Sequence, residues 1–378
     1  MNFAFSEEQE FLRETARRFL DDKVPSVRVR DLMDTEEGYD PGLWADLAGM
    51  GWQAMAIPEK YGGAGFTFLE LAVLLEEMGR SLLPAPFLSS VILGANTVLL
   101  GGNEPQKESL LGGIASGELL LALAVTEPNG KWDSSGVEMQ AEQSGDGWVL
   151  SGSKSFVIDG HVADTLIVAA RTGGTGEDDG ISLFVVAGDA SGVERSVLDT
   201  MDQTRKMATI SFTDVSVGPD ALLGGEGVGW PIIAKVLEIA AVALAVEQVG
   251  GAQKVLDMAV DYAKVRMQFG RPIGSFQAIK HKCADMLVAV ESAKSAAYYA
   301  AWAVAEDNDE LPIVSHLAKS YCSEAFFSAA SENIQIHGGI GFTWEHDAHL
   351  YFKRAKSSEL MFGDPAYHRA ILADRIGI

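Results

Sequence analysis

The stretch RMQFGRPIGSFQ carries the residue types best suited to binding chemistry, because Arg266, Phe269 and Gln277 surround a turn that a proline stiffens. An arginine can bind two phosphate oxygens at once, and an aromatic ring can cover a flat heterocycle. An amide can hydrogen-bond the edge of a base or a ribose. The stretch also interrupts a helical pattern with two glycines and a proline. A simple connection between helices would not need all of these groups, so we expect the turn to bind something.

A second segment, NIQIHGGIGFT, places Gln335 near the end of a helical pattern and follows it with Gly338, Gly339 and Gly341. Glycines at such a point let backbone N–H groups approach a pyrophosphate closely. Alone, each of the two segments is more typical of a helix–helix turn or a helix C-cap. Their occurrence in one helical region favours a binding role for both.

Other motifs give weaker indications. GGEGVG (224–229) resembles a nucleotide loop, but the sixth position of GxGxxG would be Trp230, and no parallel βαβ unit surrounds it. EHDAH puts His346 and His349 one helical turn apart without a third ligand at recognisable spacing, which favours a helix face or turn over a metal site. The sequence has no G-x-S-x-G elbow, so a hydrolase has little support.

Composition narrows the class of protein. The chain has 29 Lys and Arg against 53 Asp and Glu, a net charge of −24, which disfavours binding to nucleic acid or to an anionic membrane. The longest apolar run, 239–246, is flanked by Glu238 and Glu247 and is too short to span a bilayer. Cys283 and Cys322 form no CxxC pair. We therefore expect a soluble protein of the reducing cytoplasm.

The spacing of apolar residues changes twice along the chain. From Ser6 to about residue 117, apolar residues recur every three or four residues, as in a helix. Ser6 and Gln9 form a capping-box pattern at the start of this region. The period then becomes two, in segments such as GWVLSGSKSFVI and GISLFVVAG, separated by turn clusters at 144–147 and 172–180. Helical spacing returns after the glycine-rich stretch 218–230.

These patterns predict an α+β multidomain fold. The predicted domains are an N-terminal all-α domain (1–117), a middle antiparallel β-barrel or sandwich (118–228) and a C-terminal helical bundle (229–378).

The chain resembles the acyl-CoA dehydrogenase family of flavoproteins over nearly its whole length. The resemblance rests on the domain order and on YAKVRMQFGRPIGSFQAIKHKCADM, QIHGGIGFT and AVTEP (124–128). It implies FAD as cofactor, an acyl-CoA substrate that undergoes α,β-desaturation, and an electron-transferring flavoprotein as acceptor. It also implies a homotetramer or an α2β2 heterotetramer, with a role in fatty acid or steroid side-chain degradation.

The resemblance implies roles for particular residues. The diphosphate and adenosine of an FAD held mainly by the neighbouring subunit would be contacted by Arg266, Phe269, Gln277, Gln335, Gly338 and Gly339. Thr126 and Phe156 would lie on the flavin side of the β-domain.

The sequence departs from the family pattern where the catalytic base should stand. The usual glutamate precedes a glycine, and here Phe362 precedes Gly363. Some relatives place the glutamate in the first bundle helix, where this chain has Ala240, with Glu238 two residues away on another face. Phenylalanine and alanine cannot accept a proton, so no catalytic residue is identified.

Further departures affect the same pocket. FVIDG keeps an aromatic at Phe156 but has Ile158 where a hydroxyl to the flavin is usual, and NGKWD places Trp132 where a serine is usual. Asp364 and Ala366 stand where polar contacts to the dinucleotide are common. With these losses the chain most resembles the small, glutamate-lacking subunit of heteromeric acyl-CoA dehydrogenases, such as the pimeloyl-CoA or steroid side-chain type. A Glu-bearing acyl-CoA dehydrogenase would then be its partner.

Two alternatives remain open at this point. The chain is a self-sufficient flavoenzyme with a relocated base, for which Asp364 and Glu238 are the candidates, or it is a non-enzymatic binding protein on the same fold.

Overall fold

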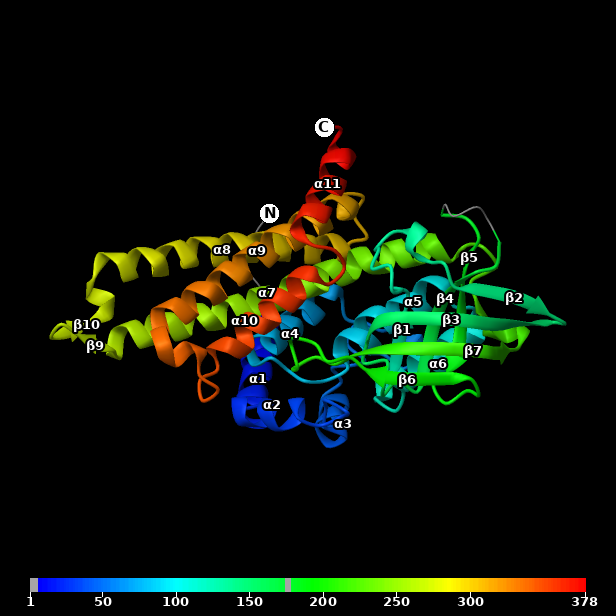
Figure 1. Ribbon diagram of the computed structural model, residues 1–378, viewed down its shortest axis with the longest axis horizontal. Helices are drawn as coiled ribbons and strands as arrows, with labels where there is room; N and C mark the ends of the chain where they lie inside the picture. The colour runs from blue at the N-terminus through cyan, green and yellow to red at the C-terminus, as the bar shows by residue number, and fades with distance from the viewer. Residues whose placement is uncertain (1–5, 174–177) are drawn as a thin grey trace. The chain divides into compact units, whose positions relative to one another are not determined.

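The computed structural model describes residues 6–173 and 178–378. The turn cluster expected at 172–180 therefore lies partly outside the described residues. The chain divides into two compact units: one runs up to Asp31 and resumes at Thr67–Leu83 and Ala241–Ile378, and the other comprises Leu32–Phe66 and Pro84–Ala240. Along the chain helices come first, strands follow, and long helices come last (Figure 1), which confirms the expected fold class.

Helices form most of the first third of the chain. Helix α1 (Glu7–Lys23) begins with the expected capping box, in which Gln9 N–H donates to Ser6 Oγ at 3.2 Å and Ser6 N–H donates to Gln9 Oε1 at 3.0 Å. These bonds satisfy N–H groups that a helix start leaves without partners. The further elements are α2 (Ser26–Met33), α3 (Pro41–Gly49), η1 (Glu59–Tyr61), α4 (Phe68–Ser81), the π-helical η2 (Leu88–Gly94), α5 (Ala95–Gly101) and α6 (Glu104–Ser116).

One sheet occupies the middle of the chain. Its strands are β1 (Leu121–Ala124), β2 (Gln140–Ser144), β3 (Gly147–Ile158), β4 (Thr165–Arg171), β5 (Ile181–Ala187), β6 (Val193–Val197), β7 (Met207–Val217) and β8 (Leu222–Leu223). The spatial order is β6-β7-β3-β2-β4-β5-β8, with β1 paired to β4. Most pairings are antiparallel, as expected, but β1 and one residue of β2 pair with β4 in parallel. Parallel neighbours need long crossovers, which short-range periodicity does not reveal.

The core of this sheet is built around β4. Leu166 and Val168 of β4 join Leu150 of β3 and Phe184 of β5 in one buried cluster. The strand is an almost continuous apolar run and is buried along nearly its whole length. Such a run is typical of a strand covered on both faces.

Long helices form the C-terminal part of the chain, namely α7 (Gly229–Val265), α8 (Gln277–Ala305), α9 (Leu311–His337), α10 (Ala348–Leu360) and α11 (Pro365–Ile376). A hairpin of β9 (Met267–Gln268) and β10 (Arg271–Pro272), followed by η5 (Ile273–Ser275), separates α7 from α8. Figure 1 shows it at the far ends of these two helices. Across residues 6–173 and 178–378, no helix is both long and apolar enough to cross a membrane.

Helices α1 and α4 belong to the same compact unit as these C-terminal helices. Arg17 of α1 donates two hydrogen bonds to the Glu77 carboxylate, at 2.7 and 2.9 Å. Tyr298 Oη of α8 donates to Glu76 at 2.7 Å. Burial raises the pKa of the Glu76 carboxyl, and Arg13 and Tyr298 oppose that shift. Buried carboxylates of α4 therefore connect it to both α1 and α8.

Candidate functional site

The hairpin between α7 and α8 carries three of the predicted residues at the surface. Its turn consists of Phe269, with φ 51°, and Gly270, with φ 76°. Two successive positive φ angles match the twist of a two-residue hairpin turn. The Phe269 side chain is 90% exposed, and Arg266 and Gln277 on either side of the hairpin are exposed as well. These side chains are open to a ligand or to another chain.

Helix α9 ends in a glycine turn that continues into η6 (Gly338–Phe342). Gly338 has φ 64° and ψ −141°, a conformation that essentially only glycine adopts. A β-carbon at Gly338 or Gly339 would meet no atom within 4 Å, so the backbone faces open space. Gln335, one turn earlier, is exposed. A bare glycine backbone fits the close approach of a diphosphate.

Two contacts bring the hairpin and the glycine turn to the same end of their unit. The ring of Tyr262, in the last turn of α7, stacks on His337 with the ring centroids 4.2 Å apart. Lys282 of α8 forms an ion pair with Glu332 of α9. The six residues predicted in this region lie on the hairpin, at the start of α8 and at the end of α9, and they are Arg266, Phe269, Gln277, Gln335, Gly338 and Gly339. A guanidinium, a ring, two amides and bare glycine backbone fit the adenosine and diphosphate of FAD.

Thr126 and Phe156, the residues predicted on the sheet side, lie on adjoining segments. The N–H of Ser155 donates to the carbonyl oxygen of Thr126 at 2.8 Å. Thr126 is buried, whereas the Phe156 side chain is 51% exposed. An exposed aromatic beside a threonine fits one face of a flat ring system.

A buried ion pair holds these two segments together. Lys154 Nζ donates to Glu127 Oε1 at 2.6 Å and to the carbonyl oxygen of Val125 at 3.1 Å. The same Glu127 oxygen accepts the N–H groups of Glu138 and Met139, each at 3.0 Å. Burial lowers the pKa of Lys154 to about 8, and Glu127 opposes that shift. Sequence reasoning missed this pair because a lysine in a strand normally faces solvent.

Three phenylalanines have left-handed backbone conformations, and all three were singled out by the family resemblance. Their φ angles are 56° at Phe156, 51° at Phe269 and 61° at Phe362. A bulky L-residue in this region costs about 1–3 kcal/mol and persists only where the surroundings enforce it. Such strain clusters at functional sites. No sequence signal could have found it, because turns with positive φ are normally recognised by glycine or asparagine.

The turn between α10 and α11 carries Phe362, which is 6% exposed, at the position expected for a base. Gly363 follows with φ 106°, and a β-carbon there would stand 2.3 Å from the ring of Tyr367. Lys319 Nζ of α9 donates to the carbonyl oxygens of Glu359 and Gly363, both at 3.1 Å. The backbone of this turn is firmly held, although residue 362 cannot accept a proton.

Residues 364, 240 and 238 are the other candidate positions for a catalytic base. Asp364 caps α11, because its Oδ1 accepts the Tyr367 N–H at 2.8 Å. Ala240 is fully buried within α7. Glu238 is partly exposed on another face of the same helix. The Asp364 carboxylate is therefore already engaged in capping the N-terminus of α11.

The histidines of EHDAH do not form a metal centre with their neighbours. His346 Nδ1 accepts the N–H of Ala348 at 3.1 Å, and His349 is buried. Burial lowers the pKa of both imidazoles. Within the described residues, no group of three or more His, Cys, Asp or Glu side chains could hold a metal ion.

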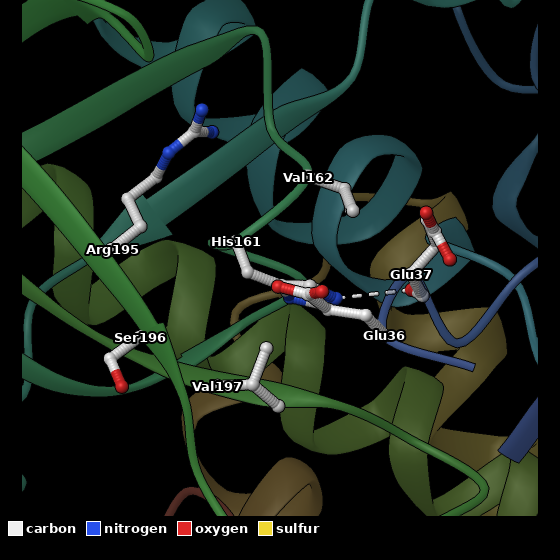
Figure 2. A pocket seen from close by; sticks show the side chains of 7 residues that line it. All are labelled: Glu36, Glu37, His161, Val162, Arg195, Ser196 and Val197. Carbon is white, nitrogen blue, oxygen red and sulfur yellow. Dashed lines mark hydrogen bonds between the residues drawn. The ribbon is translucent and has the colours of Figure 1, made fainter. Parts of the chain in front are cut away.

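A hollow of about 700 Å³ in the sheet-containing unit was not predicted. Figure 2 shows its lining side chains, which are Glu36, Glu37, His161, Val162, Arg195, Ser196 and Val197. His161 Nε2 lies 3.0 Å from the Glu37 carbonyl oxygen, so this nitrogen carries the proton. Arg195 donates to the carbonyl oxygen of Ala163 at 2.8 Å. Acidic and basic side chains both line the hollow. Its lining residues come from three separate parts of the chain, so no sequence motif could have predicted it.

The helical, sheet and helical-bundle order of the chain is that of an FAD-dependent oxidoreductase. Three family models match the chain: the acyl-CoA dehydrogenase N-terminal domain over residues 6–118, the middle domain over 122–215 and the C-terminal domain over 227–377. The chain belongs to the acyl-CoA dehydrogenase family. The family expected from the sequence and the expected enzyme class are thereby confirmed.

Similar proteins include acyl-CoA dehydrogenase IpdE2 of Mycolicibacterium smegmatis, 37% identical over 95% of this chain and 96% of that protein. Among solved structures, butyryl-CoA dehydrogenase from Megasphaera elsdenii has a TM-score of 0.93 and 29% identity, covering 100% of both chains. The ChsE4–ChsE5 complex from Mycobacterium tuberculosis contains a chain with a TM-score of 0.90 and 28% identity, covering 100% of this chain and 99% of that one.

Proposed function

We propose that this chain is the glutamate-lacking subunit of a heteromeric, FAD-dependent acyl-CoA dehydrogenase. The observation that carries the proposal is Phe362, a buried phenylalanine at the position of the base, in a turn that Lys319 holds in place. At the same time, the surface formed by the hairpin and the glycine turn keeps its full set of groups. The chain keeps the residues that would bind the FAD of a neighbouring subunit. It lacks the carboxylate that its own active site would need.

The reaction explains why a partner is needed. In the α,β-desaturation of an acyl-CoA, a carboxylate removes the α-proton, and bound FAD supplies the acceptor for the hydride that leaves the β-carbon. A phenylalanine at 362 and an alanine at 240 cannot take the proton. The partner subunit must therefore provide a glutamate, and electrons then leave to an electron-transferring flavoprotein.

The contribution of this chain would be the binding of the partner's cofactor. Arg266, with Gln277 and Gln335, offers hydrogen-bond donors, and Phe269 offers a ring for the adenine. The turn at Gly338 and Gly339 offers backbone N–H groups to the diphosphate. In an α2β2 tetramer, each copy of this chain would complete the FAD site of a partner subunit. Similarity to a chain of the ChsE4–ChsE5 complex supports a heteromer over a homotetramer.

The proposal also covers the flavin-facing residues of the sheet, the substrate class and the cellular compartment. Thr126 and Phe156 would contact a flavin ring, although Ile158 replaces the usual hydroxyl. Acyl-CoA, from fatty acid or steroid side-chain degradation, would be the substrate class. Cys283 and Cys322 are both free thiols, which suits the reducing cytoplasm.

An absorption spectrum from about 300 to 550 nm tests the proposal, because bound flavin is yellow. It is recorded for the chain purified alone and for the chain purified with a glutamate-bearing family member from the same genome. We expect a colourless chain alone, and a yellow pair that an acyl-CoA bleaches.

Two other outcomes would contradict the proposal. A chain that is yellow alone and bleached by an acyl-CoA would be a self-sufficient enzyme, and Asp364→Asn and Glu238→Gln would then locate its base. A pair that stays colourless would indicate a non-enzymatic binding protein.

A further inference from the structure

Three aromatic rings in contact, a ring stack whose third member is tilted, connect the hairpin to the glycine turn. The rings of Tyr262 and His337 lie nearly parallel, at an interplanar angle of 24° and a centroid distance of 4.2 Å. The ring of His346 lies against that of His337, with the centroids 4.4 Å apart and an angle of 51°. Tyr262 lies in the last turn of α7, His337 ends α9, and His346 precedes α10.

Hydrogen bonds fix the orientation of both imidazoles. His337 Nδ1 lies 2.9 Å from the carbonyl oxygen of Asn333, and because a carbonyl only accepts, Nδ1 carries the proton. His346 Nδ1 accepts the N–H of Ala348 at 3.1 Å, so in the neutral ring Nε2 carries the proton. Burial lowers the pKa of both histidines. Burial therefore favours the uncharged form of both rings, which permits close contact between them.

Each end of the stack is anchored to the surrounding backbone. Arg30 donates to the carbonyl oxygen of His346 at 3.0 Å and to Asp347 Oδ1 at 2.9 Å. At the other end, the N–H of Arg266 donates to the carbonyl oxygen of Tyr262 at 2.8 Å. The stack thus reaches from the residue one turn before Arg266 to the start of α10.

We propose that the ring stack of Tyr262, His337 and His346 is a positioning element that holds the hairpin and the glycine turn at the spacing required by the adenosine diphosphate half of FAD. Gly338 follows His337 directly, and the backbone of Arg266 is bonded to that of Tyr262. Without the stack, each segment is free to move. The free energy of FAD binding is then reduced by the cost of ordering both segments. The inference rests on the proposed function, because it concerns the same cofactor surface.

The test measures FAD affinity by quenching of flavin fluorescence on titration of the apo-pair, or of the chain alone if that takes up FAD. Tyr262→Ala and His337→Ala should each weaken binding about tenfold or more, because a pre-organised surface is lost. Tyr262→Phe keeps an aromatic ring in the stack and should stay within about twofold of the wild type.

A matched control separates positioning from general destabilisation. Phe327 and Phe352 form another ring contact between α9 and α10, with the centroids 5.2 Å apart. Phe352→Ala should lower the unfolding temperature and leave FAD affinity unchanged. The inference is overturned if the alanine variants at 262 and 337 bind FAD like the wild type, or if Phe352→Ala weakens binding as much as they do. A wild-type pair that takes up no FAD would overturn the proposed function, and this inference with it.

Discussion

Gly250 of α7 lies so close to α4 that a β-carbon on it would stand 1.8 Å from the carbonyl oxygen of Glu76. The contact is reciprocal, since a β-carbon on Gly79 of α4 would stand 1.9 Å from the carbonyl oxygen of Glu247. The two helices therefore touch backbone to backbone at this crossing. Glycine is required at both positions because any side chain would force the helices apart.

Gly250→Ala should destabilise the protein by about 2 kcal/mol or more, because a methyl group cannot fit against a carbonyl oxygen at that distance. Chemical denaturation monitored by circular dichroism measures the loss. Gly49→Ala is the control, since a β-carbon there meets nothing within 4 Å and alanine favours a helix. Equal stability of Gly250→Ala and wild type would show that α4 and α7 do not meet as described.

The buried Lys154–Glu127 pair should be far more sensitive to loss of one partner than of both charges. Lys154→Met leaves Glu127 buried without its cation and should cost about 3–5 kcal/mol in the free energy of unfolding. Lys154→Met combined with Glu127→Gln removes both charges, while the glutamine oxygen can still accept the N–H groups of Glu138 and Met139. The double variant should therefore recover most of the stability. A double variant as unstable as the single one would contradict this account.

The imidazoles of His316 on α9 and His368 on α11 should make stability fall in acid. Their Nδ1 atoms are 2.7 Å apart, so one proton lies between them. Burial lowers the pKa of His316 to about 4 and that of His368 to about 3, with Arg375 adding to the first shift and Lys319 to the second. Between these values and 6.5, the unfolded chain binds more protons than the folded one. The free energy of unfolding therefore decreases as the pH falls from 6.5 toward 4.

The pH dependence is measured as the urea midpoint between about pH 7 and pH 4, where each unit of pKa shift corresponds to about 1.36 kcal/mol. His316→Leu combined with His368→Leu removes both of these titrating groups and should make the slope shallower in this window. The same slope in wild type and double variant would assign the acid sensitivity to other residues.

Arg266 should contribute to FAD affinity through charge-assisted hydrogen bonds to phosphate. Arg266→Ala in the pair should weaken FAD binding about 10- to 100-fold, and the loss should shrink at high salt. Arg271→Ala is the matched control, because the Arg271 guanidinium lies over the Phe276 ring at 4.1 Å within the same hairpin. Equal losses in the two variants would show that the hairpin acts only through its net charge.

Local chemistry made part of the fold predictable from the sequence. The capping box of Ser6 and Gln9 and the strand at Gly147–Ile158 both depend on residues close in the chain. The interruption between α7 and α8 was also expected, but its form as a hairpin was not. A Phe-Gly turn is not among the usual hairpin signals, which begin with asparagine, aspartate or glycine.

The candidate site was predictable as a set of residues and not as an arrangement. The sequence indicated that Arg266 and Gly338 belong to one surface only through the family resemblance. The contact that joins their two segments is the stacking of Tyr262 on His337, two residues far apart in the chain. The buried pair of Lys154 and Glu127 gave no pattern at all, because burial of a charge is decided by its distant neighbours.

The sequence alone determined the family, the order of helical and strand regions and the absence of a proton acceptor at positions 362 and 240, because side-chain identity and short-range periodicity carry that information. The tertiary structure decided which residues meet, where a strand pairs in parallel and which phenylalanines take a strained backbone. These features depend on contacts between segments far apart in the chain, and such contacts leave no local trace in the sequence.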